Sequence, residues 1–316
     1  MVDIAGSRIL VLGAAGFIGK ELCRNLLSLG ADLVCFDRGR PSPGWLADIR
    51  KDEPRWVLGD FSDVGVIQSA LDGVDYVYHL ISTTIPDTSD KDLPHDLVSN
   101  VVPTLGLLDA LKSKSSKKVV FVSSGGTVYG VPRIIPIPES HETDPICGYG
   151  IHKLMIEKYL HWYNHNYGMD YCVLRLSNPY GPSQISDRPQ GAIGKFVYKA
   201  LRHEPIEIWG DGNTVRDYIY MDDVLVPFLL ALEYSGEKRV FNVGSGAGHS
   251  LLDIANIIEG QLGHSLEIHF SPARSTDVPL NVLDISRIKS EFHWNPSIDI
   301  HAGIHQMIEQ GQRMCL

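Results

Sequence analysis

The sequence predicts an α/β protein: a Rossmann-type doubly wound parallel sheet joined to a smaller α/β substrate-binding domain. Three observations lead to this prediction. Short apolar runs alternate with helical stretches up to Arg175, as in parallel sheets covered by helices on both faces. The first run ends in a glycine-rich turn that opens a helix. Beyond Arg175, a stretch rich in Pro, Gly and Ser introduces shorter elements, so we expect a first domain at 1–176, interleaved with 218–243, and a second at 177–316.

The individual elements follow from periodicity and length. Buried strands are expected at Arg8–Leu12, Leu33–Phe36, Trp56–Leu58, Tyr76–Leu80, Val119–Val122 and Cys172–Leu176, and shorter ones at Ile206–Ile208 and Val240–Asn242. Helices are expected at Phe17–Leu29, Leu93–Leu111, Tyr149–Tyr167, Ala192–Leu201, Asp222–Glu233, Leu251–Leu262 and Ala302–Gln312. Because such sheets bind ligands at the carboxyl ends of their strands, the residues that follow each early strand are the first candidates for a site.

The composition argues against several classes of protein. With 316 residues, 44% of them apolar, the chain can bury a core without disulfides, and its five cysteines are scattered. A formal net charge of −10, with no basic cluster beyond Lys112–Lys118, argues against a nucleic-acid partner. No apolar run is long enough to span a bilayer, so we expect a cytoplasmic protein without a membrane partner. The histidines lack the spacing of metal ligands, so no metal site is expected.

A dinucleotide site is predicted at the end of the first strand. Gly13, Gly16 and Gly19 form a G-x-x-G-x-x-G turn, and Phe17 and Ile18 begin the helix that follows. Glycines let the backbone approach a pyrophosphate closely, and the helix N-terminus favours its negative charge. A purely structural turn is the alternative, but the strand before the turn and the helix after it favour dinucleotide binding.

An acidic residue after the second strand supports this site. Asp37 lies where a carboxylate accepts hydrogen bonds from the adenosine ribose. A carboxylate there repels a 2′-phosphate, so NAD is the expected cofactor. Arg38 and Arg40 follow closely and leave NADP open as an alternative.

A Tyr–Lys pair is the candidate catalytic centre. Tyr149 and Lys153 are four positions apart, on one face of the expected helix. A lysine ammonium near a phenol favours the phenolate, so we expect the pKa of Tyr149 to fall well below its usual value of about 10 and to make it a general base. The loop after the fifth strand adds the hydroxyls of Ser123, Ser124 and Thr127 at the same sheet edge. Without that loop, a helix-surface pair would be the simpler interpretation.

With these motifs, the chain resembles the extended short-chain dehydrogenase/reductase family, in the sugar-nucleotide branch typified by UDP-galactose 4-epimerase. The resemblance covers nearly the whole chain. Besides the glycine turn, the hydroxyl loop and the Tyr–Lys pair, it rests on Asp60-Phe61, His79-Leu80-Ile81-Ser82, Asn100, Arg175-Leu176-Ser177-Asn178-Pro179-Tyr180-Gly181-Pro182, Gly210-Asp211-Gly212, Arg216-Asp217-Tyr218, Asn242-Val243-Gly244 and Arg274-Ser275-Thr276-Asp277. Members commonly dimerise, which implies a homodimer through the helices at Leu93–Leu111 and Tyr149–Tyr167.

The resemblance implies roles for individual residues. Tyr149 would take the proton of the sugar 4-hydroxyl, and Lys153 would bind the nicotinamide ribose. The other implied cofactor residues are Gly13, Gly16, Phe17, Ile18, Gly19, Asp37, Asp60, Phe61, Leu80, Asn100 and Ser123. The implied substrate is a UDP-linked sugar, and its implied binding residues are Ser124, Thr127, Tyr149, Asn178, Arg216, Arg274, Asp277 and Asn281.

Some of these substrate residues are implied to bind particular groups. Asn178, Arg216 and Arg274 are implied to bind the diphosphate, and Asp277 the nucleotide ribose. A surface ion pair with a neighbouring aspartate is the alternative for each arginine. Asn281 stands where a bulky tyrosine restricts the pocket in some members, so we lean toward tolerance of both plain and N-acetylated sugars.

The hydroxyl loop departs from the family pattern. The serine that contacts the reacting hydroxyl in the epimerases falls on Gly125 here, so Thr127, or else Ser124, is expected to replace it. Where the dehydratases and decarboxylases of this branch carry acids, this chain has Gly126 and Thr127. His152 stands where a serine is common and is expected to be a spectator on the helix.

The expected reaction is therefore the 4-epimerisation of a UDP-hexose, either UDP-glucose/galactose or the N-acetyl forms, through a transient 4-keto sugar. Tyr149 takes the 4-hydroxyl proton as the hydride passes to NAD, the keto sugar rotates, and both return on the opposite face. Two alternatives stay open. One is an NAD(P)H-dependent reductase of nucleotide 4-keto sugars, and the other is a non-catalytic dinucleotide-binding sensor.

Overall fold

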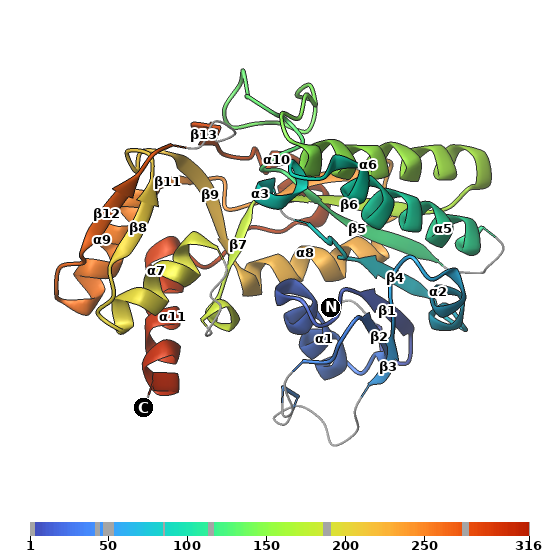
Figure 1. The fold of residues 1–316 in the computed structure, drawn as a ribbon. Coiled ribbons are helices and arrows are strands. Elements are labelled where there is room, and N and C mark those ends of the chain that lie inside the picture. Colours follow the sequence, from blue (N-terminus) through green and yellow to red (C-terminus); the bar gives the residue numbers. More distant parts are fainter. Residues whose placement is uncertain are drawn as a thin grey trace. The chain divides into compact units, whose positions relative to one another are not determined.

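The computed structural model describes residues 4–41, 45–46, 54–84, 86–112, 117–185, 191–273 and 278–315. The chain divides into two compact units (Figure 1). Unit 1 comprises Met1–Val128, Thr143–Arg175 and Pro227–Phe241, and unit 2 comprises Tyr129–Glu142, Leu176–Val226 and Asn242–Leu316. This division differs from the expected domains at two places: residues 129–142 fall in unit 2, and the interleaved segment is 227–241 rather than 218–243.

Unit 1 is organised around a seven-stranded sheet in the order β10-β6-β5-β4-β1-β2-β3. Its strands are β1 (Arg8–Leu12), β2 (Asp32–Asp37), β3 (Arg55–Leu58), β4 (Tyr76–His79), β5 (Lys118–Ser124), β6 (Tyr171–Leu176) and β10 (Val240–Val243). β1 is parallel to both of its neighbours, β2 and β4. From β1 the chain continues through β2 to β3 at one edge of the sheet. It then returns to form β4 on the other side of β1, so a topological switch point lies between β1 and β4. The predicted doubly wound sheet is confirmed.

The sheet of unit 1 is buried as its apolar strands predict. Ile9, Leu10, Val11 and Leu12 of β1 are completely buried. The helices of this unit are α1 (Phe17–Ser28), α2 (Val64–Ala70), α3 (Pro86–Ser89), α4 (Leu93–Asp96), α5 (Val102–Leu111), α6 (Gly148–Tyr167) and the later part of α8 (Met221–Glu233). Figure 1 shows α5 and α6 running together over β4 and β5, so the carboxyl ends of these strands lie near the start of α6.

The helix expected at Leu93–Leu111 is confirmed, because α4, a π-helical turn and α5 follow one another without a break over these residues. The π-helical turn, Leu97–Val101, lies between α4 and α5. Pro103 begins the next turn, and a proline lacks the N–H and clashes with the carbonyl four residues before it. Such π-turns are frequent at functional sites, and this one carries Asn100.

Unit 2 contains two small sheets. In the first, β9 (Val215–Tyr220) pairs with β11 (Gly248–Ser250), β13 (Leu280–Asn281) and β7 (Asn178–Tyr180). In the second, β8 (Ile206–Trp209) pairs with β12 (Ile268–Ser271). The helices are a 3₁₀ turn (Pro182–Gln184), α7 (Ala192–Leu201), α9 (Leu251–Leu262), α10 (Ser286–Phe292) and α11 (Ile300–Cys315). The core of this unit includes Phe196, Ile254, Ile304 and Met307.

None of the helices in the described ranges has the length and apolar character needed to cross a membrane. In the same ranges, no three His, Cys, Asp or Glu side chains are grouped as metal ligands would be.

Candidate active site

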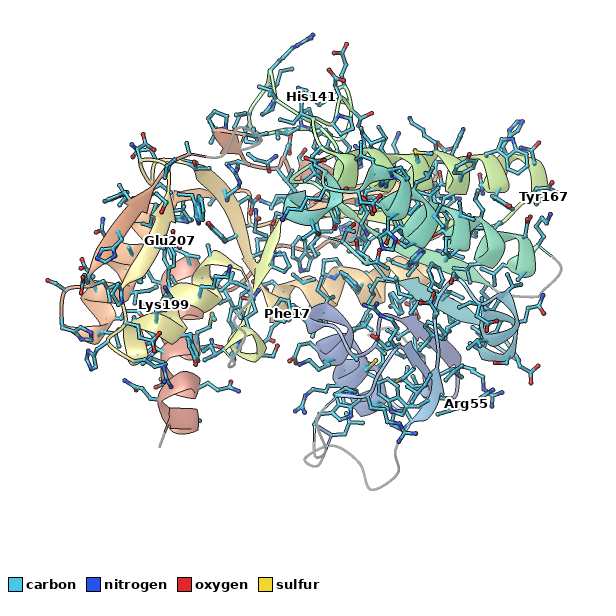
Figure 2. The ribbon with its side chains drawn as sticks, viewed as in Figure 1. Phe17, Arg55, His141, Tyr167, Lys199 and Glu207 are labelled. Carbon is cyan, nitrogen blue, oxygen red and sulfur yellow. The ribbon has the colours of Figure 1, made fainter. Side chains whose placement is uncertain are left out.

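The glycine turn between β1 and α1 has the geometry of an anion cradle. Gly13 has φ +91°, and its N–H donates to the Phe36 carbonyl at 2.9 Å, which ties the turn to β2. A Cβ on Gly19 would lie only 2.1 Å from the Gly13 carbonyl oxygen. No side chain caps the first turn of α1, where Figure 2 labels Phe17. These N–H groups therefore remain available to a phosphate.

Asp37 is fixed beside this turn. Its carboxylate accepts hydrogen bonds from the Ala15 N–H at 2.9 Å and from the Arg38 N–H at 2.7 Å. A carboxylate has about four acceptor positions, so Asp37 can also accept bonds from a ribose. The glycine turn, the uncapped helix and this carboxylate together fit a dinucleotide.

We expect Gly19→Ala to abolish dinucleotide binding and to cost about 1–3 kcal/mol of stability, because the new methyl group would overlap the backbone of the turn. Thermal unfolding and the dinucleotide content of the purified protein measure these effects. Gly260→Ala is the matched control, since Gly260 also lies in a helix but faces open space. A Gly19→Ala protein that melts normally and retains its dinucleotide would refute the cradle.

Asp60 and Phe61 follow β3. Asp60 accepts hydrogen bonds from the Ser62 hydroxyl at 2.6 Å and the Ser62 N–H at 2.8 Å, which lower the pKa of its carboxyl group. Phe61 is buried, with its ring edge-to-face against Phe36 and His79. The Phe61 ring thus belongs to the core, and only its backbone remains for a cofactor.

The end of β4 lies beside the glycine turn. The Leu80 N–H donates to the Leu12 carbonyl at 3.0 Å. A Cβ on Gly13 would lie 3.3 Å from the carbonyl carbon of Leu80. Leu80 and the cradle therefore meet at the switch point, as their predicted roles require.

Tyr149 and Lys153 share one side of α6, as their spacing predicts. The Lys153 ammonium lies 5.6 Å from the centre of the Tyr149 ring and donates to the Val122 carbonyl at 2.9 Å. Lys153 is 5% exposed. Burial lowers the pKa of its ammonium to about 8, although the carboxylates of Asp96 and Glu157 act in the opposite direction.

The expected low pKa of Tyr149 is not found in this structure. Burial raises the pKa of its hydroxyl to about 12, and a hydrogen bond with Ser82 offsets this only in part. The expectation was wrong for the chain alone because desolvation of the phenolate dominates, while the Lys153 ammonium points toward a backbone carbonyl.

The hydroxyl loop after β5 presents its hydroxyls unequally. Ser123 donates to a carboxylate oxygen of Glu157 at 2.5 Å, within a buried ion pair between Glu157 and Arg175. Its hydroxyl is therefore committed inside the protein, contrary to the expectation that it faces the site. Ser124 is half-buried.

Thr127 has the hydroxyl best placed to be used. Its Oγ1 is buried and has no hydrogen-bond partner in the described part of the chain. A Cβ on Gly150 would lie 2.8 Å from the Thr127 carbonyl oxygen, so the loop packs directly on the residue after Tyr149. The Thr127 loop therefore lies against the helix turn that carries Tyr149.

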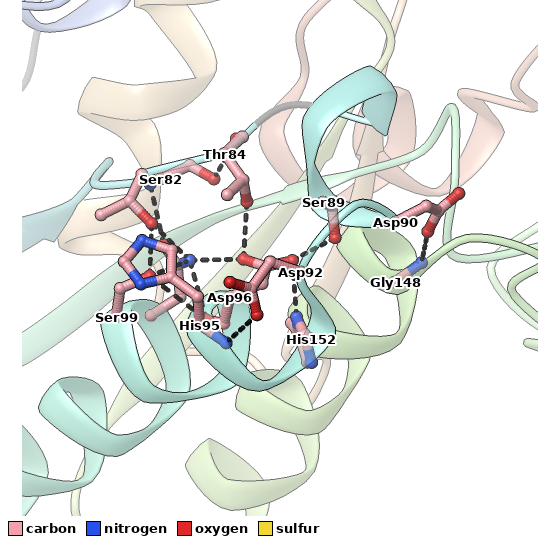
Figure 3. A network of polar contacts seen from close by, with 12 residues as sticks. Ser82, Thr84, Ser89, Asp90, Asp92, His95, Asp96, Ser99, Gly148 and His152 are labelled. Atoms are coloured by element: carbon pink, nitrogen blue, oxygen red, sulfur yellow. Dashed lines mark hydrogen bonds and ion pairs between the residues drawn. The ribbon is translucent and has the colours of Figure 1, made fainter.

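His152 has a buried neighbour that its sequence context does not reveal. Figure 3 shows it pointing at Asp96, with its Nδ1 2.7 Å from a carboxylate oxygen. Asn100 donates to the same carboxylate at 2.6 Å and accepts from the Thr83 N–H at 2.9 Å. Sequence reasoning missed Asp96 altogether, although a histidine at a helix position flanked by Tyr149 and Lys153 was a usable signal.

Three of the expected substrate residues lie on one small sheet of unit 2. Asn178 in β7 is opposite Tyr218 in β9, and Asn281 in β13 is opposite Arg216 in β9. Asn178 donates to the Asp217 carbonyl at 2.9 Å. Arg274 and Asp277 lie outside the described residues.

Arg216 contacts the backbone on its own small sheet. Its guanidinium donates to the backbone carbonyls of Val215 at 3.0 Å and Val278 at 2.5 Å. Asp217 is completely buried and accepts hydrogen bonds from Ser245, Gly246 and Leu283. Burial raises the pKa of the Asp217 carboxyl group, against these hydrogen bonds.

The chain is similar to known proteins in both sequence and fold. The model of the NAD dependent epimerase/dehydratase family matches residues 9–244. The chain belongs to this family. The match confirms the expected family, the expected enzyme type and NAD as the cofactor, and it includes the glycine turn, Asp37, Tyr149 and Lys153.

Individual relatives are similar over nearly their full length. A putative UDP-glucose 4-epimerase of Methanocaldococcus jannaschii is 32% identical over 95% of this chain and 97% of its own. A dTDP-4-dehydro-6-deoxyglucose reductase of Escherichia coli is also 32% identical, over 98% of both chains. The crystal structure of UDP-glucose 4-epimerase from Thermotoga maritima with UDP-glucose is 31% identical, with a TM-score of 0.91, and covers 98% of this chain and 100% of that one.

Proposed function

We propose that the protein is an NAD-dependent 4-epimerase of UDP-hexoses. One observation carries the proposal: a Tyr–Lys pair on α6 faces a hydroxyl loop that has no acid at Gly126 or Thr127. A dehydratase needs such an acid beside the 4-keto group, so oxidation and reduction at C4 is the chemistry that these residues support. The similarity to the M. jannaschii and T. maritima epimerases favours the same conclusion.

Tyr149 carries the proton of the reaction. With a pKa of about 12 in the chain alone, its phenol is protonated at neutral pH and is an immediate proton donor. To act as a base it must be stabilised as a phenolate, and the Lys153 ammonium lies 5.6 Å from the centre of its ring. When bound, NAD supplies the acceptor and donor of the C4 hydride and an additional positive charge.

The remaining groups orient the reactants. The uncapped N–H groups of α1 hold the pyrophosphate of the dinucleotide, and Asp37 holds its ribose. Thr127 uses its free Oγ1 to hold the reacting hydroxyl against Tyr149.

For the substrate we propose a uridine diphosphate sugar. Asn178 and Arg216 bind its diphosphate, together with Arg274, and Asp277 binds its ribose. Asn281 is smaller than tyrosine and leaves room for a 2-N-acetyl group, so both UDP-glucose and UDP-N-acetylglucosamine are proposed substrates.

A reductase of nucleotide 4-keto sugars is the second candidate, because the E. coli reductase is as similar as the M. jannaschii protein. The two functions differ in their use of the cofactor. An epimerase regenerates NAD in each cycle, whereas a reductase consumes one NAD(P)H for each product.

The test is to incubate the purified protein with UDP-glucose, and separately with UDP-N-acetylglucosamine, without added cofactor. We expect the 4-epimer to form in both, at amounts far above that of the enzyme, and Tyr149→Phe to be the inactive control. Product only from a 4-keto sugar with stoichiometric NAD(P)H would establish a reductase. Bound dinucleotide without turnover of any sugar would establish a sensor.

We further propose a homodimer formed through α5 and α6, and a cytoplasmic location. Apolar side chains are exposed on these helices: Val98 at the π-turn (57%), Val102 (51%), Ile151 (44%) and Trp162 (48%). Such exposure on adjacent helices is typical of an interface. The free state of the described cysteines Cys23, Cys35, Cys147 and Cys172 is compatible with a reducing compartment.

We expect Trp162→Glu to convert the dimer to a monomer, because it places a charge in the apolar contact. Light scattering after size-exclusion chromatography measures the mass. Val131→Glu, which changes an exposed valine outside these helices, should remain dimeric. A wild-type protein that is monomeric at micromolar concentration would exclude the interface.

A further inference from the structure

A buried carboxylate, that of Asp96, lies in unit 1 close to the Tyr–Lys pair, and the three residues line one small cavity. Asp96 is 0% exposed. Its oxygens accept hydrogen bonds from the Thr84 hydroxyl at 2.6 Å, the Asn100 amide at 2.6 Å and the Ser89 hydroxyl. His152 completes the set, with its Nδ1 at 2.7 Å. A buried charge needs this degree of compensation to be tolerated.

The partners of Asp96 come from several segments of unit 1, and Figure 3 shows Thr84, Ser89 and His152 around it. Thr84 follows Ser82, which is hydrogen-bonded to Tyr149. Asn100 lies in the π-turn. His152 lies on α6, directly before Lys153 and three residues after Tyr149. The pair therefore connects the loop after β4, the π-turn and the helix that carries the reacting phenol.

A small cavity joins the pair to the phenol. Its volume is about 10 Å³, which is the space of one water molecule. Six polar residues line it: Ser82, Asp96, Asn100, Tyr149, His152 and Lys153.

The charges around His152 are of both signs. Asp96 faces it from the end of α4, and Asp90, whose carboxylate accepts from the Gly148 N–H at 2.7 Å, lies after α3 near the start of α6. On α6 itself are Lys153 and, one turn later, Glu157.

Asp96 acts on this site as an anion. Burial alone would raise the pKa of the Asp96 carboxyl group, but the Ser89 and Thr84 hydroxyls and His152 together hold it below its usual value. The negative charge of Asp96 in turn raises the pKa of both Tyr149 and Lys153. An uncompensated Asp96 would thus oppose formation of the phenolate.

We propose that Asp96 and His152 form a positioning pair for Tyr149, in which the imidazole held against the buried carboxylate keeps that anion partnered and so governs how strongly it acts on the phenol. The pair acts through Tyr149, without itself touching the reacting sugar. The inference rests on the proposed role of Tyr149 as the proton carrier.

The test is a pair of substitutions with opposite effects on the buried carboxylate. His152→Gln removes the imidazole that partners the anion, so Tyr149 should ionise at a pH about 1 unit higher. Asp96→Asn removes the anion, so Tyr149 should ionise at a pH about 1 unit lower. His161→Gln, at an exposed position of the same helix, is the matched control and should leave the titration unchanged.

Two readouts are compared on the protein as purified. The first is the ultraviolet absorbance of the phenolate against pH, with the same variant carrying Tyr149→Phe subtracted. The second is the acidic limb of kcat/KM against pH, which should move in the same direction as the phenolate. Opposite shifts in the two variants support the pair, whereas unchanged titrations, or shifts of one sign, overturn it.

The outcome separates this inference from the proposed function. Opposite phenolate shifts in a protein that epimerises no sugar would retain the pair and remove the function. Epimerase activity with unshifted phenolate titrations would retain the function and remove the pair. If Asp96→Asn does not fold, the direction of the His152→Gln shift decides alone.

Discussion

Tyr149→Phe is expected to lower kcat by about 10³-fold, within the range for removal of a general acid–base group. The phenyl ring keeps the shape of the tyrosine but can neither take nor return the proton of the C4 hydroxyl. The KM should change by less than about threefold, because the loss concerns a proton transfer rather than binding. Steady-state rates with UDP-glucose, measured alongside calorimetric binding of the sugar nucleotide, give both quantities.

The control for this substitution is Tyr167→Phe, at the exposed end of the same helix. It should leave kcat within a factor of about two, since exposed substitutions away from the site have small effects. If Tyr149→Phe retained a tenth or more of the wild-type rate, the phenol would not be the proton carrier.

Lys153→Met is expected to lower kcat by about 10²-fold or more, and to weaken retention of the dinucleotide. Methionine fills the buried volume of the aliphatic stem but removes the ammonium, which lies 5.6 Å from the centre of the Tyr149 ring and donates to the Val122 carbonyl. The phenolate would then lack a counter-charge in a buried site, where this matters most. The control is Lys158→Met, at an exposed position of α6.

Lys153 also predicts the alkaline limit of activity. Burial lowers the pKa of its ammonium to about 8, so the charge is present below that pH and is lost above it. The wild-type kcat/KM should therefore decline as the pH rises through about 8. Lys153→Met should lack this decline at its lower rate. An alkaline limb that persists unchanged in Lys153→Met would assign it to another group.

Much of unit 1 could be predicted because its determinants are local. The strand from Arg8 to Leu12 and the glycine turn follow from apolar runs and from residues that permit close approach, and both are found as expected. The spacing of Tyr149 and Lys153 likewise places them on one helix side without tertiary information.

The errors arise where the tertiary environment decides. The direction of the Tyr149 pKa depends on burial, which spacing does not reveal. The Ser123 hydroxyl is directed inward because it donates to Glu157. Glu157 lies 34 positions later in the chain, so the sequence around Ser123 does not reveal this contact. The buried neighbour of His152 is Asp96, a residue with no motif to mark it.

In unit 2 the short strands were the hardest to predict. β7 and β13 contain only three and two residues, too few to show a periodicity. β9 has the sequence VRDYIY, with two charged residues early in the strand. One of them, Asp217, is buried and accepts hydrogen bonds from Ser245 and Leu283, which are distant from it in the sequence. Such strands are specified by their partners rather than by their own pattern.

The most direct test of the central claim is to follow the hydrogen on C4. UDP-glucose that carries deuterium at C4 should give the 4-epimer with the deuterium still at C4, because the hydrogen leaves and returns within one closed site while only the hydroxyl proton passes through Tyr149. Proton NMR of the product in ordinary water measures this retention. Loss of the deuterium to solvent, or an absence of the 4-epimer, would contradict oxidation and reduction at C4 by this protein.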